Sequence, residues 1–164
     1  MSEEIENVAL RRLQQSDYAE LLAFFQRNDT PEVTRNFNPF PLNEKTARSI
    51  CEERLDLYFV AISQRQILGL SMLRGWSEGF SVPSFGILID CSRIGRGLGR
   101  RMTEFTLMEA KAARCEQVRL SVYGSNARAL QLYLSLGFVE IQRRPINFGA
   151  GSDEKIIMIK ALTS

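Results

Sequence analysis

The chain of 164 residues contains no histidine. This absence excludes mechanisms that depend on an imidazole, among them Ser-His-Asp hydrolysis, Cys-His proteolysis and HExxH zinc chemistry. Cysteine is also scarce, because Cys51, Cys91 and Cys115 are widely spaced and form no CxxC pair. Three such residues build neither a disulfide framework nor a zinc site. We therefore expect reduced thiols that fill small spaces, and no bound metal.

Net charge and long apolar runs are limited as well. Lys+Arg 21 against Asp+Glu 19 gives a formal charge of +2 and a pI near 8.5, short of what a nucleic-acid-binding surface requires. No apolar stretch approaches the roughly 18 residues of a membrane span. The acidic residues at 3, 4 and 6 replace the cationic and apolar parts of a secretory signal. The composition predicts a cytoplasmic protein that binds neither nucleic acid nor membrane.

The hydrophobic pattern predicts one α/β domain over residues 1–164, since no repeat, low-complexity tract or linker divides the chain. Strands are expected at 8–13, 57–62, 67–73, 84–89, 118–122, 138–142 and 155–159. Helices are expected after Ser16 or Asp17, from Asn43 to about Glu53, and over 98–112 and 126–136. The segment 28–41 is expected to be irregular because it contains three prolines. This order indicates a mixed sheet with helices on both faces.

Two segments carry stronger patterns. The nearly continuous apolar run from Ser84 to Ile89 predicts a central strand buried on both faces. After it, apolar residues recur at helical spacing and predict a long helix that buries them. These are Leu98, Met102, Phe105, Met108 and Ala112.

A glycine-rich loop joins this strand to this helix. Gly95, Gly97 and Gly99 remove side chains where a ligand would approach the backbone, and the free N–H groups of the helix point to the same place. A helix N-terminus of this kind binds phosphate, so the loop predicts a pyrophosphate ligand. The spacing fits neither GxxxxGK[ST] nor GxGxxG. Three arginines add positive charge: Arg93, Arg96 and Arg100.

A second motif, Asn126-Ala-Arg-Ala-Leu-Gln-Leu-Tyr133 followed by Gly137-Phe138, accompanies this loop. Together the two blocks resemble the Gcn5-related N-acetyltransferase (GNAT) superfamily, whose signature is Gln/Arg-x-x-Gly-x-Gly/Ala and then Asn-x-x-Ala-x-x-Leu-Tyr. The second block matches completely. In the first, Gly97-Leu98-Gly99 matches, whereas Ile94 occupies the Gln/Arg position.

The resemblance implies a GNAT-type fold, with a mostly antiparallel sheet whose fourth and fifth strands splay apart, and it implies acetyl-CoA as co-substrate. The backbones of Leu88 and Ile89 would pair with the pantetheine, and Asn126 would help to hold the cofactor. The pyrophosphate would be bound by the amides of Gly95, Arg96, Gly97, Leu98, Gly99 and Arg100.

Tyr133 matches the tyrosine that the family is thought to use as the acid for the departing thiolate. It follows Asn126 by seven residues, about two helical turns, so both lie on one side of the helix. The strand positions where some relatives carry a glutamate are here Pro83 or Ser84, and Ser121. Glu78 is therefore the candidate general base, and a water chain or loss of the amine proton to solvent is the alternative.

Asp90 at the end of the fourth strand suits a capping role better than that of a base. The resemblance implies direct acetyl transfer to a primary amine of a small molecule, with amino sugars among the candidates. Acetylation of a protein N-terminus or lysine is the alternative, and a non-catalytic acyl-CoA-binding domain is the alternative from another class. A monomer and a homodimer are both compatible with the sequence. The aromatic residues expected near the acceptor are Phe37, Phe40, Trp76 and Phe80.

Overall fold

The computed structural model describes residues 7–37, 39–147, 149 and 151–162, so the acidic residues near the N-terminus lie outside the described ranges. The strands are β1 (Ala9–Arg12), β2 (Leu57–Ser63), β3 (Gln66–Arg74), β4 (Ser84–Ile89), β5 (Gln117–Tyr123), β6 (Val139–Asn147) and β7 (Ser152–Ala161). The helices are α2 (Tyr18–Asn28), α3 (Pro31–Thr34), α4 (Glu44–Glu52), α5 (Leu98–Ala112) and α6 (Ala127–Ser135). Short 3-10 turns are η1 (Gln15–Asp17), η2 (Trp76–Glu78) and η3 (Cys91–Arg93).

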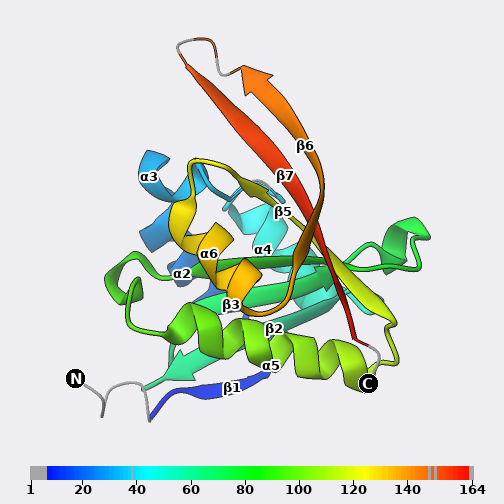
Figure 1. Ribbon diagram of the computed structural model, residues 1–164. Coiled ribbons are helices and arrows are strands. Elements are labelled where there is room, and N and C mark those ends of the chain that lie inside the picture. The colour runs from blue at the N-terminus through cyan, green and yellow to red at the C-terminus, as the bar shows by residue number, and fades with distance from the viewer. Residues whose placement is uncertain (1–6, 38, 148, 150, 163–164) are drawn as a thin grey trace.

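The strands form one seven-stranded sheet in the order β1-β2-β3-β4-β5-β7-β6 (Figure 1). Every neighbouring pair is antiparallel except β4 and β5, which are parallel. The turn from β2 to β3 contains Gln64 and Arg65 at φ 50° and 65°, the left-handed geometry of a two-residue hairpin turn. The predicted mixed, mostly antiparallel sheet is confirmed.

Helices cover both faces of this sheet, as predicted. Side chains of α2 and α4 pack with β2 and β3 on one face, and side chains of α5 and α6 pack with β5 and β7 on the other (Figure 1). Neighbouring residues of a strand point to opposite faces, so Val60 of β2 joins the first group and Phe59 joins the second.

The helix α5 has the predicted bounds but buries a different face. Leu98 and Met102 are buried as expected, whereas Met108 is 70% exposed. Thr103 and Thr106 are fully buried instead, and each donates its hydroxyl to the carbonyl oxygen four residues earlier, at 2.6 and 2.7 Å. A threonine satisfied in this way fits an apolar layer. A pattern of apolar residues in the sequence therefore does not predict the burial of Thr103 and Thr106.

The segment 28–41, expected to be irregular, contains the single helical turn α3. Pro31 is its first residue, a position where the missing N–H of proline removes no hydrogen bond. The helix α4 begins as predicted, because the Asn43 side chain accepts from the N–H of Thr46 at 2.9 Å. No side-chain capping bond starts α2, although Asp17 occupies its N-cap position.

The hairpin of β6 and β7 is longer than predicted. Its far end, where Ile146 pairs with Asp153 and Asn147 pairs with Ser152, extends beyond the rest of the sheet (Figure 1). These segments are polar and mostly exposed. Alternation of apolar residues, the usual sign of a strand, is absent there because no core lies beneath them.

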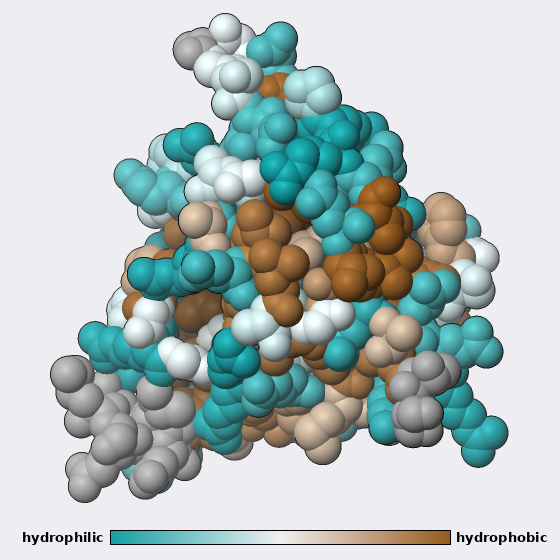
Figure 2. All heavy atoms as spheres, viewed as in Figure 1, coloured by the Kyte–Doolittle hydropathy of each residue, from teal (hydrophilic) through white to brown (hydrophobic). Residues whose placement is uncertain are grey.

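One face of the molecule combines this polar hairpin with an apolar patch. Figure 2 shows hydrophilic side chains toward the far end of the hairpin and apolar ones near the middle of the view, where α6 and the start of β6 lie. The exposed large apolar side chains of these two elements are Leu134, Val139 and Ile141. None of the described helices combines the length and apolar character needed to cross a membrane.

Candidate active site

An opening between β4 and β5 lies at the centre of the sheet. The two strands share a single register pair, Ser84 with Arg119, supported by the hydrogen bond from the N–H of Arg119 to the carbonyl oxygen of Pro83 at 3.0 Å. Beyond this pair, β4 is bonded only to β3, and β5 only to β7. The predicted splay is confirmed, and one edge of β4 is left without a partner strand over Leu88 and Ile89.

The strand β4 is less buried than expected. Ile87 and Ile89 are half-buried, and Ser84 is exposed. The divergence of β5 explains the partial exposure of Ile87 and Ile89, which lie beyond the Ser84–Arg119 pair, whereas Ser84 is exposed at the first position of the strand. Beyond that pair, β4 presents a free backbone edge, which suits an extended ligand that pairs like a strand.

The glycine loop leads from β4 to the first turn of α5. Gly95 and Gly97 have φ of 80° and 86°, the left-handed region that favours glycine. Gly97 is the N-cap of α5 and provides no side-chain cap. The N–H groups of Leu98 and Gly99 donate to no acceptor within the described ranges. These free amides and the positive end of the helix suit a phosphate group.

A surface pocket of about 480 Å³ adjoins this loop, between α5 and α6. Arg100 in its wall donates to the hydroxyl of Ser135 at 2.7 Å and lies 3.7 Å from the carboxylate of Glu104. Arg128 approaches the loop so closely that a β-carbon placed on Gly95 would lie 2.7 Å from its Nη1. The residues lining the pocket are Arg100, Arg128, Gln131, Leu132 and Ser135.

Arg128 is a basic residue that the sequence analysis did not single out. It occupies the second position of α6, where the partial positive charge of the helix N-terminus disfavours a cation. An arginine at such a position gives a signal in the sequence, because an anionic ligand would offset that repulsion.

Asn126 and Tyr133 are held by α6, as the motif predicts. The side chain of Asn126 caps the helix by accepting from the N–H of Ala129 at 3.4 Å. The segment before it is tied to β7, where the N–H of Gly124 donates to Glu154 at 2.8 Å. The side chain of Arg128 reaches from the first turn of this helix to the glycine loop.

The ring of Tyr133 packs beside the opening. It is 6% exposed and makes edge contacts with Phe85 of β4 and with Phe138, at centroid distances of 6.0 and 5.7 Å. Its hydroxyl bonds to no described residue. Among the described residues, the only fully buried side-chain nitrogen or oxygen without a hydrogen-bond partner is Nε of Arg74. The unpaired hydroxyl of Tyr133 is therefore not fully buried and contacts solvent. Burial raises the pKa of Tyr133 above its usual range.

The three side chains considered at general-base positions all lie at the surface. Glu78 ends the turn η2 and is exposed, and Ser84 and Ser121 are also exposed. The loop that carries Glu78 is held by Asp56, a buried carboxylate that accepts hydrogen bonds from the N–H groups of Gly75 and Ser77 at 3.0 and 3.2 Å. Asp56 was missed because nothing local in the sequence marks this contact.

The aromatic residues expected at the acceptor side are mostly packing residues. Phe37 is buried and meets Phe40 edge-on at 5.2 Å, and Trp76 packs against the second core. Only Phe80 is largely exposed among the four. Arg74 lies over the ring of Phe40 and donates to the carbonyl oxygen of Pro39 at 3.1 Å.

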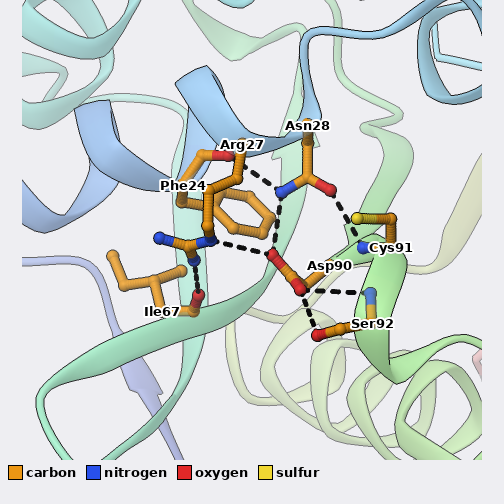
Figure 3. A network of polar contacts seen from close by, with 7 residues as sticks. All are labelled: Phe24, Arg27, Asn28, Ile67, Asp90, Cys91 and Ser92. Carbon is orange, nitrogen blue, oxygen red and sulfur yellow. Dashed lines mark hydrogen bonds and ion pairs between the residues drawn. The ribbon is translucent and has the colours of Figure 1, made fainter.

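Asp90 serves as the cap that the sequence suggested. Its carboxylate accepts from both the N–H and the hydroxyl of Ser92, at the beginning of the glycine loop (Figure 3). Within the described ranges, no group of three cysteine, aspartate or glutamate side chains could hold a metal ion.

Known proteins share this fold and sequence pattern. A family model described as an acetyltransferase (GNAT) domain matches residues 7–139. The chain is 38% identical over 130 residues to the [ribosomal protein bS18]-alanine N-acetyltransferase of Salmonella typhimurium, covering 77% of this chain and 85% of that protein.

Solved structures agree with this relationship. A GNAT family acetyltransferase from Streptococcus pneumoniae superposes with a TM-score of 0.79 at 19% identity, covering 95% of this chain and 99% of that one. A Salmonella typhimurium acetyltransferase with its cofactor acetyl-CoA gives 0.77 at 17% identity, covering 96% and 95%. The ribosomal-protein-S18-alanine N-acetyltransferase of Escherichia coli gives 0.75 at 24% identity, covering 96% and 95%. The chain therefore belongs to the GNAT family of acetyltransferases.

Proposed function

We propose that this acetyltransferase uses acetyl-CoA, without a metal, to acetylate a primary amine in the cytoplasm. The observation that carries the proposal is the parting of β4 from β5, which leaves an edge of β4 free between the Ser84–Arg119 pair and the glycine loop, with the ring of Tyr133 against Phe85 of β4. The free edge of Leu88 and Ile89 suits the amides of a pantetheine. The unpaired amides at the start of α5 suit its pyrophosphate.

Several residues would hold this co-substrate from different sides. Asn126 fixes the start of α6 beside the loop, and Arg128 adds a positive charge at Gly95. Arg100 lines the adjoining pocket. When bound, acetyl-CoA supplies an acetyl group already activated as a thioester. The chain must then orient that group, stabilise negative charge and move two protons.

Tyr133 would provide the proton for the departing thiolate. Its raised pKa keeps the phenol protonated at neutral pH, as a general acid requires. Its buried ring fixes the direction of the hydroxyl. Glu78 would accept the proton of the acceptor amine through solvent, because the strand positions where a glutamate could act more directly carry Ser84 and Ser121.

The first acceptor we propose is the α-amino group of a protein. The support is the 38% identical relative, which is named for acetylating an alanine of ribosomal protein bS18. The test set is therefore a series of peptides that differ in their N-terminal residue, with alanine among them.

A small-molecule amine is the second candidate, and Arg74 favours it. This arginine is half-buried, pairs with no carboxylate among the described residues, and has a buried Nε without a partner. Leaving such a donor unsatisfied costs about 1–3 kcal/mol. An acceptor that carries a carboxylate or a phosphate beside its amine would satisfy the guanidinium.

An acceptor screen tests both candidates. Release of free thiol from acetyl-CoA is measured with peptides that have a free or a blocked N-terminus, with amino sugars, and with amines that do or do not carry an anionic group. Amine-dependent release identifies the acceptor class. Calorimetric binding of acetyl-CoA without release for any amine would overturn the enzymatic proposal and favour a non-catalytic acyl-CoA-binding domain.

A further inference from the structure

A cluster of polar side chains joins the end of α2 to the start of the glycine loop (Figure 3). Asn28, the last residue of α2, is fully buried. Its side-chain nitrogen donates to the carbonyl oxygen of Phe24 at 2.8 Å and to the carboxylate of Asp90 at 3.0 Å. Its side-chain oxygen accepts from the N–H of Cys91 at 2.9 Å. Both donor hydrogens and the oxygen are used, so an amide fits this position fully.

Asp90 holds the other side of the cluster. One carboxylate oxygen accepts from Asn28 and from Nε of Arg27 at 3.3 Å, and the other accepts from the N–H and the hydroxyl of Ser92. Arg27 also donates to the carbonyl oxygen of Ile67 at 2.9 Å, which ties the cluster to β3. Burial alone would raise the pKa of Asp90, but the hydrogen bonds from Ser92 and Asn28 and the charge of Arg27 lower it.

Apolar packing holds little of the glycine loop. None of the residues 91–97 is buried, whereas Leu98 at the start of α5 is 3% exposed. Apolar packing therefore fixes only the far end of the loop. Gly95 and Gly97 add backbone freedom, so fixing the conformation of this loop when a ligand binds costs conformational entropy unless other contacts already fix it. The near end is held by the hydrogen bonds to Cys91 and Ser92.

We propose that Asn28 and Asp90 are positioning residues that hold the glycine loop ready for the pyrophosphate of acetyl-CoA. This inference rests on the proposed use of acetyl-CoA by the loop. On the side of the donor, the cluster contacts Cys91 and Ser92 at the start of the loop, and its other hydrogen bonds go to α2 and β3. Its contribution therefore applies to the part of the donor that the loop binds. The pantetheine half, which we assign to β4, does not depend on it.

Comparing two acetyl donors tests this assignment. Acetyl-CoA contains the pyrophosphate and the adenosine 3′-phosphate attached to it, whereas S-acetylpantetheine carries the same thioester without this nucleotide part. For Asn28→Ala we expect the KM for acetyl-CoA to rise about tenfold or more, equivalent to about 1.4 kcal/mol. We expect kcat at saturating acetyl-CoA, and kcat/KM for S-acetylpantetheine, to stay within about twofold of wild type. Asn43→Ala is the matched control, because it removes an asparagine cap from α4 without touching the loop.

Each other outcome has a distinct meaning. Equal losses with both donors would reduce Asn28 to a structural residue, and unchanged kinetics with acetyl-CoA would also overturn the inference. If wild type itself used both donors equally well, the loop would not bind the pyrophosphate and the proposed function would fail first. If Asn28→Ala does not fold, Ser92→Ala removes only the hydroxyl that donates to Asp90 at the start of the loop and leaves the buried Asn28 in place. The same donor-selective loss is expected from it.

Discussion

Replacing Tyr133 with phenylalanine removes one oxygen atom and leaves the packing of the ring unchanged. The ring contacts with Phe85 and Phe138 do not involve the hydroxyl, and that hydroxyl bonds to no described residue. No buried partner is left unsatisfied by its removal. We therefore expect the free energy of unfolding to change by no more than about 0.5 kcal/mol, and the affinity for acetyl-CoA to be nearly unchanged.

The catalytic effect of this substitution should be large. General acid catalysis contributes roughly 100-fold or more, which corresponds to about 2.7 kcal/mol in the activation free energy. We expect kcat at saturating acetyl-CoA and acceptor to fall at least 100-fold for Tyr133→Phe. The assay is the release of free thiol, followed under single-turnover conditions so that product release does not hide the chemical step.

A matched control is available in Tyr18→Phe. This tyrosine contacts Arg48 on α4, with its hydroxyl 3.4 Å from the guanidinium, and takes no part in the proposed site. Wild-type turnover is expected for it. A Tyr133→Phe enzyme that kept kcat within about twofold of wild type would refute the acid role. A large fall in melting temperature would show that the hydroxyl has a structural partner.

The remaining predictions concern the loop and its anchor. Gly97→Ala should destabilise the protein by about 1 kcal/mol, because the backbone φ of Gly97 is 86°, which strains an alanine even though the space around its methyl group is empty. The KM for acetyl-CoA should rise as well; urea titration and steady-state kinetics measure the two effects. Iodoacetamide at pH 8 should label exposed Cys91 first, because burial, together with nearby carboxylates, raises the pKa of Cys51 to about 11, and burial raises that of Cys115; peptide mapping that found Cys51 labelled first would contradict this. Asp90→Asn should cost about 2 kcal/mol at pH 7. A lowered pKa stabilises the folded state above the unfolded value near 3.8 and loses that effect as pH falls through the folded value, so urea midpoints of variant and wild type should converge below pH 4.

The sequence predicted elements whose signals are local. The helix α6, with Asn126 at its N-cap and Gly137 after its end, could be predicted from neighbouring residues alone. The hairpin of β2 and β3 does too. The buried face of α5 was predicted only in part, because Thr106 is satisfied by a carbonyl of its own helix and by Ser71 of β3 at 2.7 Å. Sequence spacing shows neither bond.

The buried polar contacts were the least predictable part of the site. Asn28 and Asp90 are 62 positions apart, and Asp56 is separated from Ser77 by 21. Each pair forms only after the sheet has assembled, so the sequence marks neither contact, although it did predict the local capping role of Asp90. The motifs predict where acetyl-CoA binds, but the side chains that give those loops their shape could be found only in three dimensions.

The missing histidine makes the pH dependence of the reaction informative. A base must take the proton of the acceptor amine, and the groups proposed for this are Glu78 and solvent. The pKa of an α-amino group lies near 7.7–8.0 and that of a lysine near 10.4. Below its pKa the acceptor amine is mostly protonated, so the reaction then depends most on a base in the enzyme. We expect Glu78→Gln to lower kcat/KM for the acceptor about tenfold at pH 6.5 and to approach wild type once the pH exceeds the acceptor pKa.

Tyr133, whose pKa burial raises, stays protonated over this range and produces no fall in rate below about pH 9.5. A Glu78→Gln profile parallel to wild type would eliminate this glutamate, whereas a fall in rate between pH 8 and 9 would show that the acid is a group other than Tyr133.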